Sequence, residues 1–350
     1  MNNIIISGIQ QIGIGVSNVH ESWKWYREQF GVDIRVFEEE AEAKLMLPYT
    51  GGQPRSRHAA LAINIQGGGG FEIWQYKGRI PEAPKQQILL GDYGIMAAKI
   101  KCHSVELTHK EFVVKGLPVS EIGIDPKNGK TFFVKDPVGN YFQLVSSTSW
   151  FKDDGKLTGG AYGVMIGVSD MDKSKAFYRD ILGYDEVVYD NTGTFKDLAG
   201  IPGGEHNFRR ALLRHSKPRV GAFSKLLGDS EIELFQAMDR KATSIFEGRL
   251  WGDLGFIHLC FDVNGMSAIE EKCKSLGHPF TVDSGNFDMG EAAGHFTYID
   301  DPDGTLIEFV QTHRVPVIKK IGFYLNLKNR NPEKSLPNWM LKALAFNKVK

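Results

Sequence analysis

Glu308 and His258 are the two residues of this 350-residue chain whose surroundings point most directly to chemistry. Glu308 lies in the apolar stretch Leu306-Ile307-Glu308-Phe309-Val310. An ionised carboxylate is costly to bury without a partner, so a cation is expected nearby if the side chain points inward. His258 lies in a similar stretch, Phe256-Ile257-His258-Leu259. This position fits either a hydrogen-bonded core residue or a metal ligand. Carboxylate and imidazole groups are both donors that divalent transition metals accept.

The elements that would position these two residues are repeated along the chain. The segment Ile14-Gly15-Val16-Ser17-Asn18 returns 152 residues later as Ile166-Gly167-Val168-Ser169-Asp170. Two further echoes are the pair Gly91-Asp92-Tyr93-Gly94 and Gly252-Asp253-Leu254-Gly255, and the pair Asp136-Pro137-Val138-Gly139 and Asp301-Pro302-Asp303-Gly304. Repeats at a nearly fixed offset indicate repeated architecture. We therefore expect two similar halves, residues 1–150 and 160–315, followed by a basic extension over residues 316–350.

Each half is predicted to contain two units, each made of one strand, one helix and about three further strands. Asn18 and Asp170 are placed to cap the helices that follow, and Gly31 and Gly183 to end them. Segments rich in β-branched and aromatic residues then favour strands. The predicted fold class is α+β, with four βαβββ units in a row. In the extension, residues 337–346 have the spacing of a short amphipathic helix.

Composition excludes several classes of protein. The hydrophobic share is 42% and the formal net charge is +0, which describes a globular chain and gives no reason to expect a nucleic-acid partner. The three cysteines have no paired spacing, which favours a reducing compartment without disulfides. The first ten residues lack a basic start and a long apolar run, and no stretch reaches membrane-spanning length. We therefore expect a cytoplasmic protein that acts on small molecules, with a homodimer as its candidate assembly.

Two motifs carry a resemblance to a known family. One is the opening of the third unit, which contains Ser174, Phe177-Tyr178-Arg179-Asp180 and Leu182-Gly183. The other is the segment from Asp300 to Glu308. Together they resemble the vicinal oxygen chelate superfamily, which includes glyoxalase I, extradiol dioxygenases and bleomycin-resistance proteins. The resemblance covers roughly residues 8 to 313 and is weakest in the second unit. It implies βαβββ modules paired into two curved-sheet, half-barrel domains around a metal or ligand cavity.

In that family, the metal ligands are a His or Gln on the first strand of a module and a Glu on its last strand. The resemblance therefore implies ligand positions at Gln11 and Glu72 in unit one, Ala97 and Gln143 in unit two, Gly163 and Glu233 in unit three, and His258 and Glu308 in unit four. Unit two cannot bind a metal with its pair, whereas unit four offers a complete His/Glu pair.

These positions can be assembled in two ways. If units pair within each half, the second half holds Glu233, His258 and Glu308, with a ligand missing at Gly163. If units pair across the halves, units one and four give the quartet Gln11, Glu72, His258 and Glu308. We favour pairing within halves, because it requires no exchange of units between them. His258 and Glu308 belong to the site in both arrangements.

Two departures from the family pattern restrict the chemistry. Extradiol dioxygenases use two histidines and a carboxylate, and Gly163 stands where the first histidine should be. Tyr298 matches a tyrosine of those enzymes and is a catalytic candidate, although an aromatic residue there is common and favours a structural role. Glyoxalase I enzymes that use glutathione carry an arginine four residues after the first ligand, where this chain has Gly15 and Gly167. Glutathione is therefore not the expected cosubstrate.

Two hypotheses of function follow from the resemblance. The first is a metal-dependent enzyme of the glyoxalase or dioxygenase type that binds two neighbouring oxygens of a small substrate through a divalent ion, namely Fe, Zn, Mn or Ni. Glu233 or Glu308 would then carry the proton. The second is a metal-free protein of the bleomycin-resistance type that sequesters a small ligand. Degeneration at Ala97, Gln143 and Gly163 supports the second hypothesis.

Overall fold

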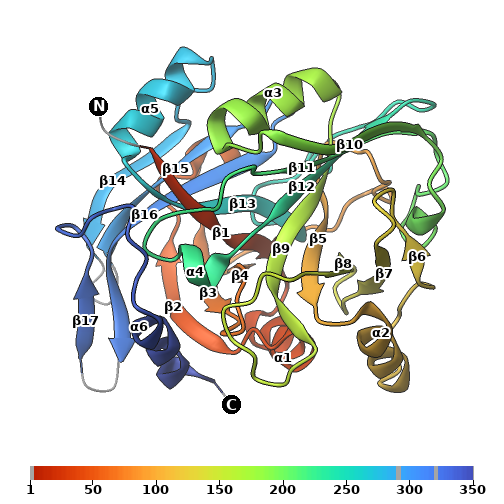
Figure 1. Ribbon diagram of the computed structural model, residues 1–350. Helices are drawn as coiled ribbons and strands as arrows, with labels where there is room; N and C mark the ends of the chain where they lie inside the picture. The colour runs from red at the N-terminus through yellow and green to blue at the C-terminus, as the bar shows by residue number, and fades with distance from the viewer. Residues whose placement is uncertain (1–3, 289–292, 319–321, 350) are drawn as a thin grey trace.

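The computed structural model describes residues 4–288, 293–318 and 322–349 (Figure 1). Its described helices are α1 (Val19–Phe30), α2 (Val105–Val114), α3 (Met171–Leu182), α4 (Ser224–Leu227), α5 (Met266–Ser275) and α6 (Asn338–Ala343), with short 3-10 turns η1 (Leu47–Tyr49), η2 (Lys196–Leu198) and η4 (Leu344–Asn347). None of these helices in the described part of the chain is long and apolar enough to cross a membrane.

The strands form two mixed sheets, which we call sheet A and sheet B. Sheet A contains β1 (Ile5–Gly15), β2 (Ile34–Glu42), β3 (Ser56–Ile63), β4 (Gly70–Tyr76), β13 (Gly255–Asn264), β14 (Val282–Asp288), β15 (Ala293–Asp300), β16 (Leu306–Ile318) and β17 (Phe323–Asn326). Sheet B contains β5 (Gly94–Cys102), β6 (Gly123–Ile124), β7 (Lys130–Lys135), β8 (Tyr141–Ser146), β9 (Thr158–Gly167), β10 (Glu186–Gly193), β11 (Phe208–Arg214) and β12 (Glu231–Ala237). The predicted α+β class with four βαβββ units in two curved sheets is confirmed.

The units pair across the two halves of the chain. Sheet A has the order β14-β15-β16-β13-β1-β4-β3-β2, with β17 beside β16, so it joins the first unit to the fourth. Sheet B has the order β10-β11-β12-β9-β5-β8-β7-β6 and joins the second unit to the third. Figure 1 shows the red and orange strands of the first unit in the same sheet as the blue strands of the last. The within-half pairing that we favoured is therefore wrong, and neither residues 1–150 nor residues 160–315 form a sheet alone.

The repeated sequence motifs explain how the units are held in pairs across the two halves. The Asp253 carbonyl lies so close to Gly15 that an added Cβ would be 1.9 Å from its oxygen, and Asp92 lies in the same way against Gly167. Only glycine allows this approach, which joins units one and four and units two and three. The helices instead connect units within a half, because the Tyr26 hydroxyl donates to Asp136 at 2.7 Å and the equivalent tyrosine of α3 does the same in the second half.

The helix signals of the sequence are confirmed at both ends. The Asn18 side chain accepts hydrogen bonds from the backbone of His20 and Glu21, which satisfies amide groups that have no partner within the helix. Gly31 ends α1 in the left-handed region at φ 62°. The largest buried apolar cluster combines strands of both sheets with α1, α2, α3 and α5, so the two sheets share one core. The predicted C-terminal helix is present as α6 and η4, and Leu341 and Leu344 bury it against the rest of the molecule.

Asp262 on β13 gives the stability of this core a pH dependence. Burial raises the pKa of Asp262 to about 7, although a hydrogen bond with Ser7 acts in the opposite direction. An acid whose pKa is higher in the folded than in the unfolded state stabilises the fold at low pH, and this contribution is lost as pH rises from about 4 to about 7. Asp262→Asn is therefore expected to raise the free energy of unfolding by roughly 2–4 kcal/mol at pH 8, with little effect at pH 4. Urea denaturation at both pH values measures this; an equal effect at both would exclude the charge as its cause.

Candidate metal centre

Gln11, Glu72, His258 and Glu308 come together on one face of sheet A, and we call them the quartet. They lie on four adjacent strands, β1, β4, β13 and β16 respectively. The register explains their meeting, because Gly13 pairs with Glu72 on one side of β1 and with His258 on the other. Pairing of units one and four is thus what brings the two residues of each unit to one point.

The spacing of the quartet suits a metal ion. His258 Nε2 lies 3.3 Å from Glu72 Oε2 and 3.2 Å from Glu308 Oε2. Gln11 Nε2 lies 3.4 Å from each of these two carboxylate oxygens. Donors bound to one ion at about 2.0–2.2 Å in tetrahedral geometry are separated from one another by about 3.3–3.6 Å. The observed separations therefore already approach those of a coordination shell.

Unsatisfied polar atoms in the quartet also fit a metal. Among the described residues, His258 Nδ1 and Gln11 Oε1 have no hydrogen-bond partner. His258 is fully buried, so an unpaired ring nitrogen there is costly. The oxygen and nitrogen of an amide exchange places by rotation of the side chain, so Gln11 can offer its oxygen to a cation.

The charges of the quartet are coupled. Burial raises the pKa of Glu308, and the charge of Glu72 adds to this, although His258 opposes it. Burial acts in the same direction on Glu72, but a hydrogen bond and the charge of His258 bring the pKa of Glu72 below its ordinary value. Burial acts to lower the pKa of His258, yet the two carboxylates raise it. When both are ionised, two buried carboxylates that share one imidazole carry more negative charge than the imidazole neutralises, which favours a cation.

Gly13 makes room for the imidazole, and its replacement is a direct test of the centre. A Cβ at Gly13 would lie 2.3 Å from His258 Cε1 and 2.7 Å from Nε2. Gly13→Ala should therefore displace the ring and lower the affinity for a divalent ion about 10–100-fold, as other changes in the support of metal ligands do. Competition with a chromogenic chelator measures this affinity. An unchanged affinity in a folded Gly13→Ala protein would show that the ring does not bind the ion.

A cavity of about 740 Å³ opens beside the quartet. Gln11, Glu72 and Glu308 line it, but most of its wall is apolar, including Trp74, Leu226, Trp251, Phe287 and Phe296. Trp251 stacks on His258 with ring centroids 6.1 Å apart, and Tyr298 meets the same ring edge-on at 5.6 Å. Tyr298 thus lies in the wall of the cavity beside Glu308, its register partner on β16. No motif pointed to Trp251, which lies in a turn between the third and fourth units.

Glu233 lies on sheet B, away from the quartet. The expectation that it would lie beside His258 is therefore wrong. The two residues are on β12 and β13, which belong to different sheets. Glu233 instead pairs with Lys99 Nζ at 2.6 Å and Arg210 Nε at 2.5 Å, and Tyr189 also donates to it. Burial acts against ionisation, but these two cations lower the pKa of Glu233 to about 2. Its charge is therefore already neutralised by side chains.

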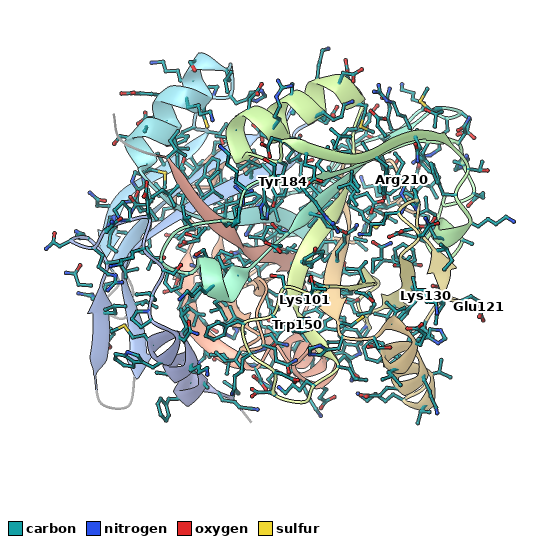
Figure 2. The ribbon with its side chains drawn as sticks, in the orientation of Figure 1. Lys101, Glu121, Lys130, Trp150, Tyr184 and Arg210 are labelled. Carbon is teal, nitrogen blue, oxygen red and sulfur yellow. The ribbon has the colours of Figure 1, made fainter. Side chains whose placement is uncertain are left out.

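In the interior of sheet B, lysine and arginine side chains occupy the region that corresponds to the quartet of sheet A. Lys99 pairs in register with Gly163 just as Cys260 pairs with Gln11, and its ammonium group also lies 2.6 Å from Glu231. Arg210, labelled in Figure 2, is fully buried and forms a two-pronged ion pair with Asp197 at 2.8 and 2.9 Å. In the sequence, lysine and arginine within strands that should line a cavity were the available sign that the interior of sheet B is held by ion pairs and has a structural role.

Comparisons with known proteins agree with the geometry. The family model described as "Glyoxalase/Bleomycin resistance protein/Dioxygenase superfamily" matches residues 8–144 and 163–309. Glyoxalase I from Zea mays is 15% identical, with 87% of this chain and 92% of that chain covered and a TM-score of 0.56. A "putative dioxygenase" from Bacillus subtilis is 14% identical, with 88% and 86% covered and a TM-score of 0.56. At these identities the likeness concerns the fold.

Among the curated proteins, none matches this sequence. The family match nevertheless covers most of the chain, and its two segments coincide with the two repeats. The chain belongs to the glyoxalase/bleomycin resistance protein/dioxygenase superfamily.

Proposed function

We propose that this protein is a metal-dependent enzyme of the glyoxalase and dioxygenase type, with one active centre formed by units one and four. The observation that carries the proposal is a buried Gln-Glu-His-Glu quartet that faces a large apolar cavity. Gln11, Glu72, His258 and Glu308 would hold a divalent ion, and their mixture of oxygen and imidazole donors suits Fe, Zn, Mn or Ni. When bound, such an ion supplies Lewis-acid polarisation of two neighbouring substrate oxygens.

Glu308 is the residue that we assign to proton transfer. Its carboxylate lines the cavity, and burial raises its pKa, whereas a hydrogen bond and the charge of His258 lower the pKa of Glu72, which is also buried. A carboxylate that holds a proton near neutral pH can take it from a substrate carbon or hydroxyl and return it to a neighbouring atom. Tyr298 lies beside Glu308 and keeps its hydroxyl protonated, since burial raises the pKa of Tyr298 well above its ordinary value. Tyr298 can therefore donate a hydrogen bond to a substrate oxygen.

The substrate is expected to be more apolar than a glutathione adduct. The cavity has room for a drug-sized molecule, and its tryptophan and phenylalanine side chains favour an aromatic or long aliphatic group. No side chain fits at Gly15 or Gly167, since the Asp253 and Asp92 carbonyl groups fill that space. This supports the expectation that the glutathione-binding arginine has no counterpart here.

Two substrate classes test the proposal against the metal-free alternative. The protein is stripped with a chelator, loaded with Fe²⁺, Zn²⁺, Mn²⁺ or Ni²⁺, and assayed with hemithioacetals of apolar thiols and with alkyl- or aryl-substituted catechols. The proposal expects turnover with at least one ion and none in the stripped protein. Asp262→Asn, which removes another buried carboxyl group of sheet A, is the control and should keep that turnover.

The metal-free binding function makes the opposite prediction. If the protein only sequesters ligands, the stripped and loaded forms will bind bleomycin with equal affinity in a calorimetric titration. Equal binding together with no turnover under any ion would overturn the enzyme proposal.

A further inference from the structure

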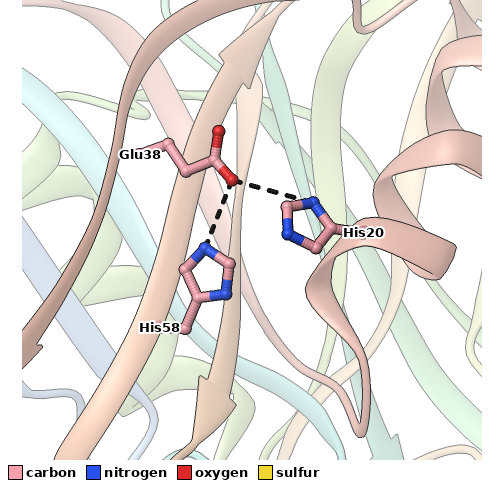
Figure 3. Close-up of side chains that lie close together, drawn as sticks. All are labelled: His20, Glu38 and His58. Carbon is pink, nitrogen blue, oxygen red and sulfur yellow. Dashed lines mark hydrogen bonds and ion pairs between the residues drawn. The ribbon is translucent and has the colours of Figure 1, made fainter.

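A second group of potential ligands lies outside the quartet, on the first unit. His20 at the start of α1, Glu38 on β2 and His58 on β3 point toward one another (Figure 3). One carboxylate oxygen, Glu38 Oε1, lies 3.7 Å from His20 Nδ1 and 3.2 Å from His58 Nε2. We propose that these three side chains form a second metal site, for a divalent transition-metal ion that accepts imidazole ligands.

The separations match those of donors around one ion. Ligand atoms of the three residues all lie within 4.8 Å of one another. Donors bound at about 2.0–2.2 Å in tetrahedral geometry are about 3.3–3.6 Å apart. His20 and His58 approach edge to face, with ring centroids 5.1 Å apart, so their nitrogens can face a common point without the rings clashing. The His20 side chain is mostly exposed, so no packed neighbours hold its ring away from the other two ligands.

The backbone on both sides of His20 is fixed, so the site is supported by the fold. Asn18 caps the first turn of α1 by accepting from the backbone of His20 at 3.0 Å. The preceding residue, Val19, donates its backbone N–H to Gln75 Oε1 at 3.0 Å. Gln75 pairs in register with His58 on the adjacent strand. The start of the helix is therefore tied to β4, the strand that pairs with the strand carrying His58.

Glu38 is oriented by a neighbouring cation that leaves the other carboxylate oxygen for the metal. Arg35 Nη1 donates to Glu38 Oε2 at 3.2 Å, whereas Oε1 faces the two imidazoles. A hydrogen bond to the second oxygen of a ligating carboxylate is the usual support of a metal ligand. The exposed fractions of the side chains are 70% for His20, 20% for Glu38 and 11% for His58, so an ion can enter from solvent and retain water.

The second site is separate from the proposed active centre. Phe37, Glu39 and Arg57 line the cavity beside the quartet, and side chains alternate between the two faces of a strand. Glu38 and His58 therefore point to the opposite face of sheet A. Two imidazoles and one carboxylate favour Zn²⁺, Ni²⁺ or Cu²⁺ over the oxygen-preferring Mg²⁺ and Ca²⁺.

Zinc content at equilibrium tests the proposal. Wild-type protein, His20→Ala, His58→Ala and the control His206→Ala are dialysed against Zn²⁺, and bound zinc is measured per chain. His206 is a suitable control because its Nδ1 lies 3.3 Å from Asp239 and its Nε2 lies 3.9 Å from Glu205, and among the described residues it belongs to no group of three clustered ligand atoms. The wild type and His206→Ala should hold about one more equivalent than the two other variants. Zinc should also raise the melting temperature less in His20→Ala than in the wild type, since a site is missing.

Equal zinc content in all four proteins would overturn the second site. His20 is exposed, so its replacement leaves the fold intact and this outcome can be interpreted. The result does not depend on the quartet. If the quartet bound no zinc, the wild type would hold one equivalent, and His20→Ala would still lose it.

Discussion

Glu308→Gln is expected to lower turnover by about a thousandfold or more while the protein stays folded. Glutamine keeps the size of the side chain and an oxygen donor, but it cannot take up a proton from the substrate. The measurement is the single-turnover rate of metal-loaded wild type and variant, with the best substrate of the two classes proposed above. Bound metal is measured on the same samples, so that loss of the ion is distinguished from loss of proton transfer.

Two comparisons make this prediction specific. Glu72→Gln should lose less turnover than Glu308→Gln per bound ion, because Glu72 is the carboxylate that stays ionised. Asp262→Asn should have full turnover. A Glu308→Gln protein that retains its metal and turns over within tenfold of the wild type would contradict the assignment of the proton to this residue.

Lys99→Met is expected to destabilise the protein by about 3–5 kcal/mol, the largest stability effect that we predict. The ammonium group of Lys99 lies between Glu231 and Glu233, and all three side chains are buried. Removal of the cation leaves two ionised carboxylates with fewer partners inside the protein. Guanidinium denaturation at pH 7 measures the loss, and the additional replacement Glu233→Gln should restore part of it.

Lys101, two residues along the same strand, provides the matched control. Lys101 is also buried, but its Nζ donates to the backbone oxygen of Ser149 at 2.5 Å. The same Nζ lies over the Trp150 ring, and both residues are labelled in Figure 2. Burial lowers the pKa of Lys101 to about 7, and the charge of Asp229 offsets this only in part. Lys101→Met should therefore leave stability unchanged or raise it. Equal losses for Lys99→Met and Lys101→Met would show that packing, not charge, accounts for the effect.

Local features of the fold could be predicted because their causes are local. Asn18 and Gly31 delimit α1 through contacts within a few residues, and the repeat predicted the second copy of this helix. His258 and Glu308 could be predicted as neighbours, because both belong to one unit whose strands β13 and β16 pair directly.

The pairing of units could not be predicted from the same patterns. Strands β1 and β9 carry similar sequences, and either could be placed beside β13 on hydrophobic pattern alone. Asp253 approaches Gly15 closely, and Asp92 approaches Gly167 in the same way, so one repeated motif occurs at both contacts between residues far apart in the chain. The glycines were visible in the sequence, but their partners were not. Glu233 was misplaced for the same reason, since its neutralising partner Lys99 lies in the other half.

The position of a bound ion tests the central claim most directly. Crystals of the protein grown with Mn²⁺ and measured at a wavelength where manganese scatters anomalously would locate it. We expect one strong peak within about 2.0–2.3 Å of donor atoms of Gln11, Glu72, His258 and Glu308, and none beside Glu233. An ion bound at Glu233, or a quartet that stays without one at saturating Mn²⁺, would contradict the account.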